Sequence, residues 1–179
     1  MAAVRGGGPG GRGRARYFGL GAAGGTWGRR GPFSALYGNS SGGVISMFTA
    51  DGGPETIGEI ATAFGSDGVK RTGLKLSGQQ GALQYNVSAS RFETDGSRDH
   101  SAASRTGFNG KVKYTLNEDT RWTFVLNSVR MPDVQDPLGL TRKELDAHPR
   151  QATPVALTFN TRTSVDQTQA RLATDHRFA

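Results

Sequence analysis

The sequence contains no cysteine among its 179 residues, which excludes disulfide bonds, thiolate metal sites and a cysteine nucleophile. It also has no run of about 18 apolar residues, the length that a membrane-spanning helix requires. The GxSxG, HExxH and GxxxxGK[ST] patterns of hydrolases, zinc proteases and phosphate-binding loops are missing as well. These absences predict a protein that is not an enzyme and that uses no cofactor and no bound metal.

Acidic residues are missing from residues 1–30, which contain six arginines. The other 149 residues carry 16 basic and 15 acidic side chains, so +6 of the net charge of +7 lies at one end of the chain. Residues 1–29 also contain eleven glycines and cannot bury enough apolar surface to offset their ordering entropy. We expect a Gly/Arg-rich, poorly formed N-terminal segment. An RNA-binding Arg/Gly segment is an alternative, because Tyr17 and Phe18 lie among the arginines.

A period of two dominates the chain after residue 54. Leu83, Tyr85, Val87 and Ala89 alternate with polar residues, as do Phe108, Val112, Tyr114 and Leu116, and then Trp122, Phe124 and Leu126. Such alternation places one set of side chains on each face of a β-strand. Segments 57–65, 69–77 and 160–172 fit further strands, which makes about six. A helix is expected only near 141–147, where Thr141 can serve as the N-cap.

The connections between these strands differ in length. Residues 66–68, 77–81 and 117–119 form short connections, whereas 94–105 and 132–159 form long ones. In outer-membrane barrels, short periplasmic turns alternate with longer extracellular loops. Alternation and hairpins are also typical of a soluble β-sandwich, so this pattern leaves both architectures open.

The segment that precedes the strands carries the most specific motif. Residues 30–47 read RGPFSALYGNSSGGVISM, and this stretch resembles the end of the plug domain of TonB-dependent outer-membrane receptors. The matching positions are Arg30, Gly31, Pro32, Ser34, Leu36, Tyr37, Gly38, Gly42, Gly43, Val44 and Ile45. Segments 64–68 (FGSDG), 94–105 and 136–145 resemble later parts of siderophore-type members.

The resemblance implies an all-β fold, a partial transmembrane antiparallel β-barrel of about six strands preceded by the C-terminal part of a plug. Residues 30–53 would end the plug and residues 54–179 would form the first barrel strands. Since barrels of this family have about twenty-two strands, the chain is expected to be a fragment that cannot span a membrane alone, because its open edges would leave backbone groups unpaired in lipid.

The function that the resemblance implies is energised uptake of a scarce solute across the cell outer membrane. The expected partners are a ferric siderophore or similar chelate, TonB in the full-length relative, and outer-membrane lipid, but no nucleic acid. The plug motif residues would be structural. Ligand contact in this family comes from plug apices and extracellular loops, so the candidate ligand-facing residues are Arg98, His100 and Arg105, whose cations suit an anionic chelate.

Two other classes remain open at this point. A soluble or secreted β-sandwich binding module requires a second sheet that covers the apolar faces of the strands. An Arg/Gly-rich nucleic-acid-binding protein requires salt-dependent RNA binding through residues 1–30. The spacing of His100, His148 and His176 matches no zinc or facial-triad pattern.

Overall fold

The computed structural model describes residues 2–5, 23–30 and 43–178, and it describes side chains from residue 49 onward. A small sheet contains β1 (Ala2–Arg5), β2 (Ala23–Arg30) and β3 (Gly43–Thr49). Both β1 and β2 pair antiparallel with β3, which gives the order β1-β3-β2. Two strands thus lie within or at the border of the N-terminal segment for which composition predicts little structure.

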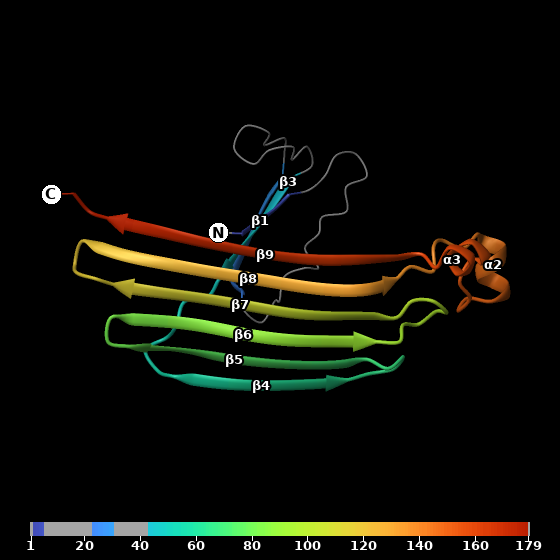
Figure 1. Ribbon diagram of the computed structural model, residues 1–179, viewed down its shortest axis with the longest axis horizontal. Helices are drawn as coiled ribbons and strands as arrows, with labels where there is room; N and C mark the ends of the chain where they lie inside the picture. The colour runs from blue at the N-terminus through green and yellow to red at the C-terminus, as the bar shows by residue number, and fades with distance from the viewer. Residues whose placement is uncertain (1, 6–22, 31–42, 179) are drawn as a thin grey trace.

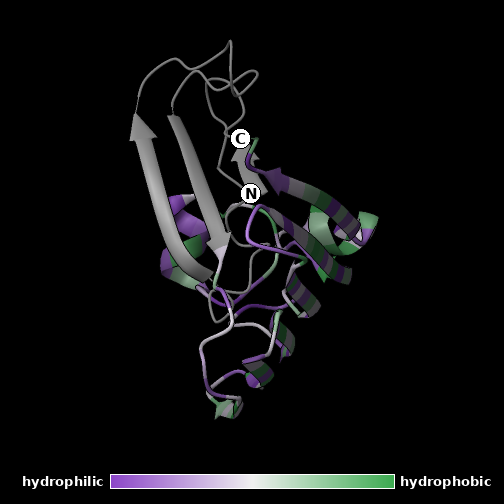
Figure 2. Cartoon of the chain, turned by 90° about the vertical axis from the view of Figure 1, so that its left-hand side faces the viewer, coloured by the Kyte–Doolittle hydropathy of each residue, from purple (hydrophilic) through white to green (hydrophobic). Residues whose placement is uncertain are grey.

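A larger antiparallel sheet follows, in which each strand pairs with the next one in sequence (Figure 1). Its strands are β4 (Ile57–Phe64), β5 (Lys70–Gln80), β6 (Leu83–Thr94), β7 (Ala103–Thr115), β8 (Thr120–Gln135) and β9 (Arg162–His176). Seen nearly end-on in Figure 2, the strands follow a curved arc. The arc is open, since β4 and β9 are its two edges within the part of the chain that is described.

The six predicted strands are confirmed, because each of them coincides with one strand of this sheet. The register also confirms the predicted faces. Tyr114 lies opposite Leu83 on β6 and opposite Trp122 on β8, so the apolar sets of three strands share one face. All-β architecture is therefore observed, and the sheet is not a closed barrel.

Three predicted connections were too long. Strand β5 continues through Gln80, so residues 77–80 are strand and only residues 81–82 turn, with Gly81 at a φ of 57°. The predicted loop 94–105 shrinks to 95–102, and β8 extends to Gln135 with a register shift between Met131 and Val134. Serine and glycine are weak strand formers, but antiparallel pairing of Ser77 and Gly78 with β6 overrides that preference.

Two short helices interrupt the connection between β8 and β9. The predicted helix is confirmed as α2 (Arg142–Ala147), where Thr141 and Glu144 form a capping box. Helix α3 (Pro154–Phe159) was not predicted, although Thr153 caps it and Pro154 occupies its first turn, a combination typical of helix starts. Both helices lie at one end of the sheet in Figure 1.

Candidate functional site

The two faces of the large sheet differ in character, and we name them by the chain segment that crosses one of them. Residues 49–53, which begin with the last residue of β3, cross the inner face. The opposite side is the outer face. The outer face carries most of the large apolar side chains of the six strands, and many of them are strongly exposed. These include Ile60, Phe64, Leu74, Leu76, Leu83, Tyr114, Leu116, Trp122, Phe124 and Leu172. The sheet therefore exposes its apolar side rather than burying it.

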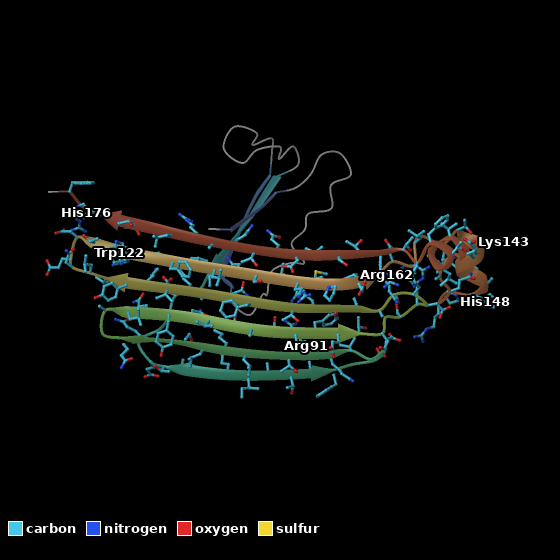
Figure 3. All side chains as sticks on the ribbon, in the orientation of Figure 1. Arg91, Trp122, Lys143, His148, Arg162 and His176 are labelled. Atoms are coloured by element: carbon cyan, nitrogen blue, oxygen red, sulfur yellow. The ribbon has the colours of Figure 1, made fainter. Side chains whose placement is uncertain are left out.

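The apolar band of the outer face has distinct borders. At the end near the 117–119 turn, the rings of Tyr114 and Trp122 lie 6.4 Å apart, and Figure 3 shows Trp122 close to that end of β8. Toward the opposite end, charged side chains replace apolar ones: Arg91 pairs with Glu93 at 2.5 Å, and Arg130 lies 3.9 Å from Asp166. The apolar band of the outer face thus lies between an aromatic pair at one end and charged side chains at the other.

The inner face is predominantly polar. Its central row runs from Ser77 through Asn86 and Lys111 to Val125, and the neighbouring row contains Ser88, Asn109, Asn127 and Gln169. Near β4 the small residues Ala61, Gly73 and Ser90 floor a hollow of about 270 Å³. The ion pair between Lys75 and Glu59, 3.0 Å long, stands at its rim.

Residues 49–53 are attached to this inner face by polar contacts. The Lys111 ammonium donates to the Thr49 carbonyl at 2.9 Å and pairs with Asp51 at 2.6 Å, while Lys113 pairs with the other oxygen of Asp51 at 2.5 Å. Burial alone would raise the pKa of Asp51, but the hydrogen bonds and charges of the two lysines lower it below its usual value. Asp51 is therefore held as a carboxylate between two cations.

The loops at the helix-bearing end pack against one another. The Arg98 guanidinium donates to the carbonyls of Gln151, Leu138 and Pro137, at distances from 2.8 to 3.3 Å. Arg150 pairs with Asp67 at 2.5 Å, which joins the 65–69 turn to the long connection. Arg98 thus holds the backbone of the long loop in place, and sequence reasoning gave no sign of this role.

His100 and Arg105, the other two candidate ligand-facing residues, occupy different settings. The His100 Nε2 lies 2.8 Å from the carbonyl oxygen of Thr161, and His100 has a φ of 54°. Arg105 was expected in a loop, and this placement was wrong: it belongs to β7, opposite Phe92 on the inner face and in line with Arg71. Whether these side chains contact a solute stays a prediction.

The plug motif is largely outside the described residues. Of its positions, Gly31, Pro32, Ser34, Leu36, Tyr37, Gly38 and Gly42 lie there, whereas Arg30 ends β2 opposite Gly43 at the start of β3. Over the part of the chain that is described, no cluster of three His, Cys, Asp or Glu side chains could hold a metal ion. None of its helices is long and apolar enough to cross a membrane. A scan of protein-family models gives no match to the chain.

Proposed function

We propose that the chain forms the end of the plug and the first strands of a TonB-dependent outer-membrane receptor that takes up a scarce solute, such as a ferric siderophore. The observation that carries the proposal is the inverted distribution of polarity. Only Val125, Val129, Ala152 and Ala156 are buried apolar residues from residue 49 onward, whereas the outer face exposes large apolar side chains. A sheet that is apolar outside and polar inside suits lipid on one side and a water-filled, plugged lumen on the other.

The strand lengths support the same proposal. Strands β5 to β9 contain 11, 12, 13, 16 and 15 residues, well above the five or six that are common in globular proteins. A tilted strand needs about 9–11 residues to cross the hydrocarbon layer. From Phe108 on β7 to Leu116, the residue that follows this strand, the apolar positions span about 26 Å at roughly 3.3 Å per residue, which is close to the height of an outer-membrane apolar band.

The connection lengths also fit. The long connections 95–102 and 136–161 lie at the same end as the 65–69 turn, while the connections 81–82 and 116–119 lie at the other end. In the proposed receptor, the interlocked loops around Arg98 would face outward, toward the solute. The polar contacts of residues 49–53 would join the plug to the inner wall of the barrel.

A soluble β-sandwich would bury the outer face under a second sheet. The exposed fractions of Ile60 and Phe64, both 78%, and of Leu172, 72%, are those of an uncovered face in the described structure. The soluble β-sandwich is therefore the second candidate, and the location of the protein in the cell separates it from the receptor.

Fractionation of the cells that produce the protein tests the proposal. Antibodies raised against residues 136–161 should recognise a protein of the outer-membrane fraction, with a mass well above the 19.0 kDa of this sequence. They should also bind intact cells, because the proposed topology places this loop outside. A 19 kDa antigen in the soluble fraction would overturn the proposal and favour the sandwich.

A further inference from the structure

The segment between the two sheets is fixed differently from the rest of the structure. Each strand of the large sheet is joined to its neighbour by a long backbone ladder, which only the register shift between β8 and β9 interrupts. Residues 49–53, in contrast, are attached to the inner face by side-chain groups: Lys111 and Lys113 bind Thr49 and Asp51, and the Asn86 amide donates to the Ala50 carbonyl at 3.2 Å. Such contacts can be replaced by water without breaking the sheet.

Gly52 explains why this segment can lie so close to the sheet. A Cβ at this position would be 2.1 Å from the carbonyl oxygen of Gly78 and 2.5 Å from that of Tyr85, which is far inside any allowed contact. Glycine is therefore required by the close backbone approach and not by a left-handed conformation. Its neighbour Gly53 has no atom within 4 Å of a corresponding Cβ.

The part of the inner face that lies under residues 49–53 also contains a buried polar atom for which the described structure shows no hydrogen bond. Asn86 is 1% exposed, and its Oδ1 has no hydrogen-bond partner among the described atoms. A buried acceptor without a donor disfavours the closed arrangement, whereas the two ion pairs of Asp51 favour it. Opposing contributions of this kind make local opening accessible without unfolding of the whole molecule.

From these contacts we propose that residues 49–53 act as a releasable strap on the inner face, seated by Gly52 and latched by Asp51 between Lys111 and Lys113. Opening of the strap uncovers the buried Ser77 and Asn86 and frees both ammonium groups, while β4 to β9 stay paired. The strap goes beyond the proposed uptake function, since it depends only on contacts within this chain and not on the solute or on TonB.

The lack of cysteine makes the test direct. Ser77→Cys places a single thiol on the covered face, where Ser77 is 9% exposed, and the rate of maleimide labelling then reports strap opening. The measurement uses the full chain in detergent micelles. We expect Gly52→Ala and, separately, Asp51→Asn to raise this rate at least about tenfold, whereas Gly53→Ala should leave it within about twofold of the parent rate.

A second reporter separates release from unfolding. Ala156→Cys places the thiol in α3, at a site that is 0% exposed and lies in the loop cluster rather than under the strap. Its labelling should stay slow in all three strap variants. Equal labelling of Cys at position 77 in the Gly52→Ala and Gly53→Ala backgrounds would overturn the strap, and so would parallel acceleration at both reporters, because that result means global unfolding.

Discussion

Replacement of Phe124 by arginine tests whether the outer face meets hydrocarbon. Phe124 lies on β8 in a row with Val112 and Leu172, midway between Trp122 and Leu126 on the same face. An arginine at the middle of a lipid-facing band costs about 2–4 kcal/mol, which lowers the folded-to-unfolded ratio roughly 30- to 700-fold. We expect Phe124→Arg to lose this amount in urea titrations of the protein in detergent micelles.

Two control variants isolate the cause. Phe124→Ala measures the loss of packing alone, and Asn127→Arg places the same charge on the inner face of the same strand, where it should change stability by no more than about 0.5 kcal/mol. The reasoning is refuted if Phe124→Arg costs no more than Phe124→Ala. A water-exposed face would give that result, since an arginine is tolerated there.

Three further outcomes follow from single contacts. Because the two lysines lower the pKa of Asp51 in the folded state, its carboxylate stabilises the strap fully at pH values above its unfolded pKa of about 3.9. This stabilisation is lost as the pH falls through the lower pKa of the folded state. A ¹³C titration of the carboxyl group should show a higher pKa for Asp51 in a Lys113→Gln variant. Thr141→Ala removes the cap of α2 and should cost about 1 kcal/mol locally, seen as faster amide exchange in residues 142–147 only. Arg98→Ala removes the guanidinium that binds three carbonyl groups, of which only that of Pro137 keeps another donor among the described residues, the Thr153 amide. Limited proteolysis should therefore cut the 136–161 connection several-fold faster, and Arg98→Lys should restore little because lysine lacks the planar fork.

The strands of the large sheet could be predicted because the alternation that marks each strand lies within a short stretch of sequence. Apolar and polar residues alternate along each strand, and this alternation assigns Leu83 and Tyr114 to the apolar face. The observed pairing of Leu83 with Tyr114 places both side chains on that same face. Strand ends were less predictable, since Ser77 and Gly78 have low strand propensity and extend β5 only because β6 pairs with them. The N-cap residue Thr141 was the signal that predicted α2. Thr153 followed by Pro154 is a comparable signal and could have predicted α3.

The contacts that hold the loops and the strap were not predictable, because they join residues distant in sequence. Asp51 meets Lys111 and Lys113 only once β7 takes its place beside β6. Likewise, Arg98 binds carbonyls that lie 39 to 53 positions further along the chain. The alternation of residues and the sequence motifs predict whether such a residue lies on a face of the sheet or in a loop. Which residue it contacts depends on the register of the whole sheet.

Solvent accessibility along β7 tests the central claim most directly. Nitroxide labels at each position from Phe108 to Leu116, one at a time in the protein in detergent micelles, report collisions with apolar oxygen and with a water-soluble nickel complex. We predict a period of two, with oxygen favoured at positions 108, 110, 112, 114 and 116 and nickel favoured at positions 109, 111, 113 and 115. Uniform nickel access on both faces would contradict the account, because the apolar face would then be an ordinary water-exposed surface.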